Sequence, residues 1–386
     1  MSAPIVKGWC PGALRPMMSG DGLVVRIRAP LGRISQDQAK GIALASERFG
    51  NGVIDLSARA NLQIRGVSTA SHPEIVTALG EIGLIDSDPL IEARRNITVS
   101  PFWSERDATH KISEHLNLVL CTNNAPQTPG KFGYTVDCGP APVLSQAAAD
   151  IRIERAQNGQ LMVRADGADF GAPVTEDTAV QTALDLAHWF LDSGGAPSGR
   201  GRMAHHLSNG AVLPSGFDVL AKKPEGQSID LDQHSQFGTL VAFEFGQLTS
   251  KTLRHLASLG GLRLTPWRMI LVENCTNVPE FPGILTPSDA PLLRVSACTG
   301  APGCPQALSS TRDLARQLSS ILGPHQSLHV SGCRKGCAHP GPAEVTVTAT
   351  AENQFDLINN GRASDQPDIT GLSPADLHNH ITNRGS

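Results

Sequence analysis

The sequence lacks long hydrophobic runs and any excess of basic residues. No apolar stretch approaches the roughly 18 residues of a membrane-spanning helix, so we expect no transmembrane segment. Residues 1–18 contain no continuous apolar core of the kind found in signal peptides, and we therefore expect a cytoplasmic location. The 32 basic residues are balanced by 36 acidic ones, for a net charge of -4, which leaves no generally basic surface for nucleic acid.

A glycine-rich dinucleotide fingerprint is also missing. No G-x-G-x-x-G motif follows a predicted strand, so we expect no nicotinamide or flavin Rossmann domain within the chain. With 386 residues, 40% of them hydrophobic and 18% charged, the chain has the composition of a globular protein of two or three domains.

The sequence does contain an internal repeat. Residues 22–67 and 238–273 each have the pattern of a strand, a glycine-containing turn, a helix, a second glycine-containing turn and a strand. Ser35 is the expected N-cap of the first helix, and Thr249 that of the second. The segment Ser57-Ala58-Arg59-Ala60 of the first copy corresponds to Thr265-Pro266-Trp267-Arg268 of the second.

Each repeat is followed by a longer stretch in which strands and helices alternate. A hairpin is predicted around Asn158-Gly159, and another strand at 344–350. Pro305 is expected to open a helix that reaches about Leu322. The fold class is therefore α+β, with four parts at residues 15–75, 76–230, 231–280 and 281–386.

Four cysteines near the C-terminal end carry the strongest chemical signal. Cys298 and Cys304 form a C-x5-C pair, and Cys333 and Cys337 follow as C-x3-C. Four thiolates around one point suit zinc or an iron–sulfur cluster. Structural zinc usually uses tighter pairs, so the wider spacing favours a cluster. The flanking glycines agree, because they let backbone N–H groups approach inorganic sulfide.

The repeat and the cysteines together resemble the sirohaem-dependent nitrite and sulfite reductase superfamily, from about residue 15 to about residue 360. The resemblance implies two ferredoxin-like half-domains, two α/β halves and a 4Fe-4S cluster on the four cysteines. The reductases bind their anion with an arginine of a T-x-R-Q motif, an arginine of an R-N-V segment and two lysines of a P-R-K-F-K segment. The matching residues here are Arg59, Arg95 and Lys131, whereas Ala60 replaces the glutamine and Gly133 the second lysine.

These departures weaken a site for a small inorganic anion and leave room for a larger ligand. Within the superfamily, the chain is most similar to an enzyme of aerobic cobalamin biosynthesis, in the stretches RPMMSGDGLVVRIRAPLGRIS and DLSARANLQIRGV and around the cysteines. That resemblance implies a monooxygenase that uses dioxygen to hydroxylate precorrin-3A, a haem-like tetrapyrrole, and to close a lactone on it. Two alternatives are a sirohaem-dependent nitrite or sulfite reductase and a non-catalytic tetrapyrrole or iron–sulfur carrier.

Guanidinium groups suit the carboxylates of such a macrocycle. Arg59, Arg95 and Lys131 are therefore the candidate catalytic and substrate-binding residues. Further candidate carboxylate contacts are Arg26, Arg28 and Arg65.

A coordinatively full cluster passes single electrons but does not activate dioxygen, which needs an open metal site or a flavin. We therefore expect a mononuclear non-haem iron near the cluster and an external electron donor. The candidate iron ligands are His205, His206, His329 and His339. Sirohaem is expected only under the reductase alternative.

Overall fold

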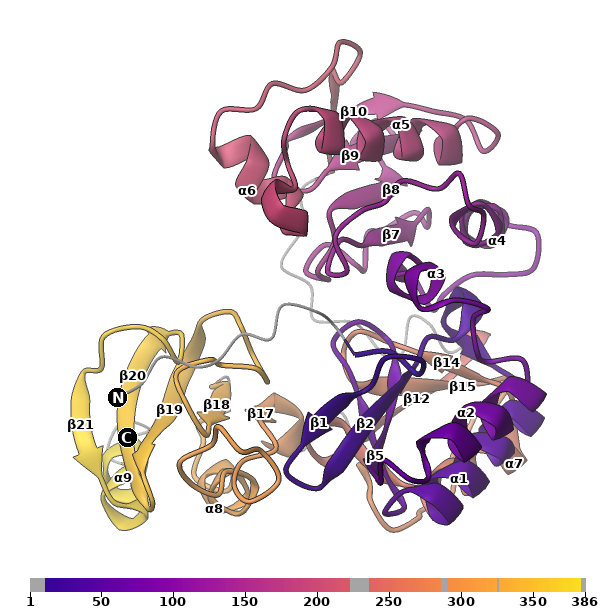
Figure 1. The fold of residues 1–386 in the computed structure, drawn as a ribbon. Helices are drawn as coiled ribbons and strands as arrows, with labels where there is room; N and C mark the ends of the chain where they lie inside the picture. Colours follow the sequence, from indigo (N-terminus) through magenta and orange to yellow (C-terminus); the bar gives the residue numbers. More distant parts are fainter. Residues whose placement is uncertain (1–10, 223–235, 286–290, 325, 383–386) are drawn as a thin grey trace.

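The computed structural model describes residues 11–222, 236–285, 291–324 and 326–382. Its strands form four sheets. Figure 1 shows the sheets of the two repeats side by side, with the first α/β part above them and the C-terminal part beside them. No helix in the described ranges has the length and apolarity that crossing a membrane would require.

The first repeat folds as the sequence predicts. Ser35 caps its helix in a full capping box, in which the Ser35 side chain accepts from the backbone N–H of Gln38 and the Gln38 side chain accepts from that of Ser35. Its elements are β1 (Met17–Ser19), β2 (Gly22–Ile27), β3 (Arg33–Ile34), α1 (Gln36–Phe49), β4 (Val53–Leu56) and β5 (Leu62–Val67).

The second repeat has the same plan, which confirms the predicted repeat. Leu31 and Phe245 take the same left-handed turn, with φ of 56° and 55°, and Ala60 and Arg268 take another, with φ of 52° and 60°. The elements are β12 (Gly238–Phe243), β13 (Gln247–Thr249), α7 (Ser250–Leu259), β14 (Leu262–Leu264), β15 (Met269–Glu273) and β16 (Ile284–Leu285).

The two repeats exchange a short strand. The first sheet has the order β1-β2-β5-β4-β13, and the second has the order β16-β12-β15-β14-β3. Each repeat thus completes the sheet of the other, as in a two-fold symmetric dimer. Helix α1 packs against α7 and against α2 (His72–Glu81), and all three cover one side of the paired sheets (Figure 1). Their shared core includes Ile75 and Leu79 of α2, a helix that continues past the boundary predicted at residue 75.

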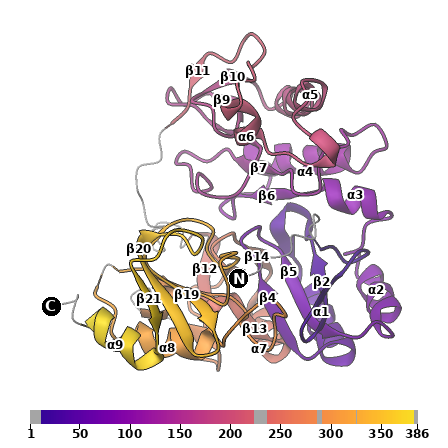
Figure 2. The same ribbon diagram turned by 60° about the vertical axis from the view of Figure 1, so that its left-hand side comes forward.

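The two α/β parts are also built alike. In each, three parallel strands are followed by an antiparallel hairpin, which includes the hairpin predicted at Asn158-Gly159. The first contains α3 (Pro89–Arg94), β6 (Ile97–Val99), α4 (Ala108–Leu120), β7 (Tyr134–Asp137), β8 (Ile151–Arg155), β9 (Leu161–Ala165), β10 (Phe170–Pro173), α5 (Ala179–Asp192), α6 (Met203–Ser208) and β11 (Val219–Leu220). The second contains β17 (Val295–Ala297), α8 (Arg312–Ser319), β18 (Leu328–Ser331), β19 (Ala343–Ala351), β20 (Gln354–Gly361), β21 (Ile369–Leu372) and α9 (Pro374–Thr382). Figure 2 shows the two parts from another side.

The helix predicted to start at Pro305 is wrong in its start, because α8 begins only at Arg312. The residues before it form a loop that packs on the end of β18. The backbone N–H of Ala301 donates to the carbonyl of Ser309, and that of Leu308 to the carbonyl of Gly332. These bonds hold the cysteine-bearing segment as a loop rather than as a first helical turn.

A buried acid ends β7. The Oδ2 atom of Asp137 accepts hydrogen bonds of 2.7 Å from the backbone N–H groups of Val143 and Leu144. Burial nevertheless raises the pKa of Asp137 to about 6, above the usual 3.8. The folded chain therefore holds this proton more tightly than the unfolded chain, and stability falls as the pH rises from about 4 to about 6.

Replacing Asp137 with asparagine keeps an oxygen for both N–H groups and removes the buried charge. We expect the free energy of unfolding at pH 7 to rise by about 1–3 kcal/mol, and its decline between pH 4 and pH 6 to flatten. Urea denaturation at several pH values measures both effects. Asp185→Asn, on the exposed side of α5, is the matched control and should change neither. A loss of stability at every pH in Asp137→Asn would contradict the prediction.

Candidate functional site

A positively charged cleft lies where the first repeat sheet meets the C-terminal α/β part. Its volume is about 320 Å³, and both repeats and the loop around Cys298 line it. Its charged lining residues are Arg26, Arg59, Arg65, Arg268, Arg312 and Asp55. We call it the arginine cleft. Five guanidinium groups around one carboxylate make it a site for an anionic ligand.

The cysteine loops form one wall of this cleft. Cys298 follows β17 and Cys337 lies beyond β18, and both line the cleft. The Sγ atom of Cys298 accepts a hydrogen bond of 3.2 Å from the backbone N–H of Gly332. A Cβ on Gly332 would lie 2.7 Å from that of Ala307, so only glycine allows this approach. A backbone N–H aimed at a cysteine sulfur is the contact expected around an iron–sulfur cluster.

All four predicted cysteines gather here. Although Cys337 is exposed at the surface, desolvation raises the pKa of its thiol. Lys335 opposes this rise. The nearby thiols of Cys333, Cys298 and Cys304 add to it. Within the described ranges, however, no three cysteine, histidine or acidic side chains are already placed to hold one metal ion. Four thiols that repel one another as thiolates, with a backbone donor between them, fit the chemistry of a cluster ligand set.

Arg59 and Lys131 are brought together at the edge of the arginine cleft. The Nη2 atom of Arg59 donates to the carbonyl oxygen of Lys131 at 3.0 Å, while the Lys131 side chain is exposed. Gly133 lies beside them, and a Cβ there would be 2.9 Å from Nδ2 of Asn96 and 3.4 Å from Nη1 of Arg59. The position that carries a lysine in the reductases therefore has no room for one in this arrangement.

Arg95 lies away from the cleft. Its guanidinium group donates to both carboxylate oxygens of Asp86, at 2.8 and 2.9 Å, and to the carbonyl oxygen of Arg28 at 2.8 Å. Only 7% of Arg95 is exposed. In this arrangement Arg95 stabilises the segment before α3. Its contact with a substrate stays a prediction. Arg28 is also outside the cleft lining and faces Glu92 at 3.5 Å.

Three cleft residues were missed by the sequence analysis. Arg268 occupies the position of Ala60 in the second repeat, so the alignment of the two copies contained a signal for it. Asp55 on β4 and Arg312 at the start of α8 have no distinctive sequence context. Only the fold places these three side chains together.

The histidines predicted as iron ligands separate into two groups. His329 on β18 is fully buried, and its ring centre lies 5.8 Å from that of His339 in the cysteine loop. Burial, His339 and Arg268 lower the pKa of His329 to about 4, so its ring is neutral, as a metal ligand must be. His205 and His206 lie on α6 of the other α/β part and bond to Asn209 and Ser193.

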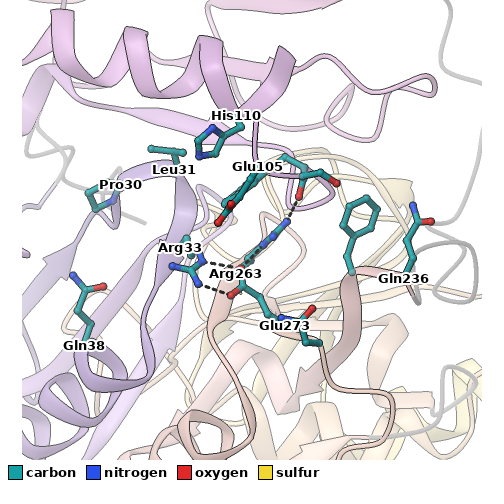
Figure 3. A pocket seen from close by; sticks show the side chains of 13 residues that line it. Pro30, Leu31, Arg33, Gln38, Glu105, His110, Gln236, Arg263 and Glu273 are labelled. Atoms are coloured by element: carbon teal, nitrogen blue, oxygen red, sulfur yellow. Dashed lines mark hydrogen bonds and ion pairs between the residues drawn. The ribbon is translucent and has the colours of Figure 1, made fainter. Parts of the chain in front are cut away.

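A second cavity lies on the other side of the paired repeats, against the first α/β part (Figure 3). Its volume is about 540 Å³. The repeat relates two of its charged residues to those of the arginine cleft, with the opposite sign: Arg263 takes the place of Asp55, and Glu273 that of Arg65. Arg33 takes the place of the uncharged Gln247 beside that cleft. No cysteine is among the described residues that line the second cavity.

The comparisons with known proteins agree with this geometry. The family model of the nitrite/sulfite reductase ferredoxin-like half domain matches residues 15–82. The structure of the Mycobacterium tuberculosis NirA protein superposes with a TM-score of 0.63 and 16% identity, over 93% of this chain and 79% of that one. A ferredoxin–nitrite reductase of Synechococcus elongatus is 24% identical, over 86% of this chain and 77% of its own. The fold is therefore similar to that of the NirA protein, and residues 15–82 match the ferredoxin-like half domain of the nitrite and sulfite reductases.

The chain also resembles a particular enzyme along nearly its whole length. A precorrin-3B synthase of Sinorhizobium sp. is 27% identical, over 95% of this chain and 85% of its own. The resemblance predicted from the sequence is thereby confirmed, and the precorrin-3B synthase interpretation is favoured over the reductase alternative.

Proposed function

We propose that this chain is a cytoplasmic precorrin-3B synthase. It would use dioxygen and electrons from an external donor to hydroxylate precorrin-3A and to form a lactone on it, as a step of cobalamin biosynthesis. One observation carries the proposal: the arginine cleft lies directly beside the loops of Cys298 and Cys337. The similarity to a precorrin-3B synthase over 95% of the chain supports the same reaction.

The charge of the cleft suits this substrate. Precorrin-3A is ringed by acetate and propionate carboxylates, and each needs a cation or several donors when it leaves water. Arginine binds a carboxylate through two parallel hydrogen bonds, and lysine binds as a point charge. Arg59 at the rim, with the exposed Lys131 beside it, would receive the first carboxylates, whereas Arg268 and Arg312 would receive those that enter deepest.

The cysteines would hold a 4Fe-4S cluster, which supplies single electrons when bound. Cys298, Cys304, Cys333 and Cys337 provide the thiolates, and the N–H of Gly332 stabilises the charge on the first of them. The neutral ring of His329 and the adjacent ring of His339 are the nitrogen ligands that we propose for a mononuclear iron. The chain itself would orient the macrocycle against this wall and exclude water from it.

The reductase alternative is disfavoured by Gly133. Reduction of nitrite or sulfite needs concentrated positive charge around a small anion. A Cβ at this position would collide with the side chain of Asn96 and touch Arg59, so the second lysine of the reductases cannot be restored without moving Asn96. A sirohaem chromophore in the purified protein would favour the reductase.

The direct test is turnover of precorrin-3A. Protein purified anaerobically, with its optical and EPR spectra recorded, should convert precorrin-3A to a hydroxylated lactone under air and should leave it unchanged under nitrogen. Binding of precorrin-3A without conversion under air would instead identify a carrier.

Replacing Arg59 with alanine is expected to weaken binding of precorrin-3A by about 1–3 kcal/mol, because one carboxylate loses its guanidinium partner. Anaerobic titration followed by absorbance measures the affinity without turnover. Arg200→Ala, in an exposed loop of the first α/β part, removes the same charge outside the cleft lining and should leave the affinity unchanged. Equal affinities in Arg59→Ala and the wild type would exclude Arg59 as a substrate contact.

A further inference from the structure

We propose that Arg268 and Arg312 together bind one carboxylate of the macrocycle beside the cysteine loops. We further propose that Asp55 attracts these two guanidinium groups and limits how tightly that carboxylate binds. The inference rests on the proposed function for the identity of its ligand. It adds a specific subsite and an internal acid that competes with the ligand.

The two arginines are held inside the cleft without a full set of partners. Nη2 of Arg268 donates to the carbonyl oxygen of Ala338, next to Cys337, at 2.8 Å. Arg312 is 18% exposed, and its Nε atom has no hydrogen-bond partner in the described part of the chain. Burial lowers the pKa of each; the charge of Arg312 lowers that of Arg268 further, the charge of Arg65 lowers that of Arg312 further, and Asp55 raises both. Two half-buried cations with an unused donor form a receptor for an anion.

Arg268 also has a strained backbone. Its φ of 60° is a left-handed conformation that costs a side-chain-bearing residue energy, and such strain is found where function requires a fixed side chain. The same turn carries Ala60 in the first repeat. The turn is thus common to both copies, whereas this position carries an arginine only in the second copy, where it bonds to the residue after Cys337.

Asp55 is the one acid among the described residues that line the cleft. Its Oδ1 atom accepts a hydrogen bond of 2.8 Å from Nε2 of Gln247. Its contacts with the arginines are longer, at 3.6 Å to Arg65 and 3.8 Å to Arg312. These distances attract and orient the guanidinium groups but leave their N–H donors for another acceptor. A ligand carboxylate would take those donors against the repulsion of Asp55.

The second cavity shows the contrasting arrangement (Figure 3). There Glu273 accepts bonds of 2.8 and 2.7 Å from Arg33 and one of 2.7 Å from Arg263, so both arginines are already engaged by a carboxylate of the chain. Glu105 adds a second acid to its wall. Because its two arginines are balanced by two acids, this cavity is no second site for a polyanionic macrocycle.

The test measures binding of uroporphyrin III, a stable macrocycle whose edge carries a full set of acetate and propionate carboxylates, by quenching of its fluorescence. Arg312→Gln should weaken binding roughly ten- to hundredfold, because a buried carboxylate loses a charged partner. Asp55→Asn keeps the bond to Gln247 and should tighten binding roughly three- to tenfold, because a repelling charge is gone. Arg33→Gln removes the same charge from the second cavity and should bind as the wild type does.

The gain in Asp55→Asn separates the proposal from a structural role, since a damaged fold would only weaken binding. Unchanged affinity in Arg312→Gln, weaker binding in Asp55→Asn, or no binding by the wild type would each overturn it. If Arg312→Gln alters only the reduction potential of the cluster, the arginines serve the cluster instead and the proposal also falls. Conversion of precorrin-3A is measured in parallel on the wild type. Its failure would overturn the proposed function, while the porphyrin titrations would still decide this subsite.

Discussion

Serine in place of Cys333 is expected to abolish the visible absorbance of the cluster and, with it, all turnover of precorrin-3A. A hydroxyl is a harder and far less acidic ligand than a thiol, and it does not replace a thiolate on iron. The hydroxyl of Ser331 donates to the carbonyl oxygen of Cys333 at 2.7 Å and fixes the loop in which this thiol lies. Cys304→Ser should behave in the same way.

Iron and sulfide analysis together with EPR spectra of the reduced protein measures the loss. Cys275→Ser is the matched control, because Cys275 is half-buried and its Sγ atom lies near the carbonyl of Asn277 in a different loop. It should keep the full content of iron and sulfide. If Cys333→Ser and Cys304→Ser also keep it, the ligand assignment is wrong. If the purified protein contains zinc in place of iron, the four cysteines form a tetrahedral zinc site, which is the alternative that their spacing left open.

The repeat could be predicted because its signals are local. Ser35 and Thr249 cap helices through hydrogen bonds to residues three positions away, and the glycines end those helices within one turn. The strand exchange could not be predicted, because β3 is only two residues long and its partner β14 belongs to the other repeat. Such a pairing depends on how the two sheets meet, which no local pattern encodes.

The site residues also fall into those that local sequence predicts and those that only the fold brings together. Spacing and glycine context indicated the four cysteines, since these are properties of neighbouring residues. The matched motifs identified Arg59 and Lys131, which the fold brings together, and also Arg95, which the fold binds to Asp86. A motif identifies the residue, whereas its burial and its hydrogen-bond partners decide whether its charge is available to a ligand. Asp55 and Arg312 enter the cleft only through tertiary structure.

The reversed charges of the second cavity lead to the largest expected loss of stability. Only 6% of Glu273 is exposed, and it is the shared partner of Arg33 and Arg263. The Arg263 guanidinium is 3.8 Å from the centre of the Trp103 ring and donates to two backbone carbonyls, so it cannot move to water. Glu273→Gln would leave this buried cation without the acid that is hydrogen-bonded to it, and we expect a loss of about 3–5 kcal/mol in the free energy of unfolding.

The pH dependence of the stability provides an independent test of this role of Glu273. Burial opposes ionisation of Glu273, but the hydrogen bonds from Arg33 and Arg263 outweigh it, so the pKa lies below the usual 4.5. The stabilisation by this carboxylate is therefore complete above pH 4.5 and is lost as the pH falls through the lower folded-state value. Urea denaturation of Glu273→Gln should show the full loss at pH 7 and a smaller loss in acid.

Asp55→Asn is the matched variant in the arginine cleft, and the comparison separates the roles of the two cavities. Asp55 contacts its arginines at longer range, so we expect its replacement to cost less than about 1 kcal/mol of stability. An equal cost in both variants would mean that Asp55 is as structural as Glu273, and that its arginines are already engaged. If Asp55→Asn loses little stability and Glu273→Gln loses much, Glu273 serves the stability of the fold. Asp55, which contacts its arginines at longer range, then belongs to the ligand site.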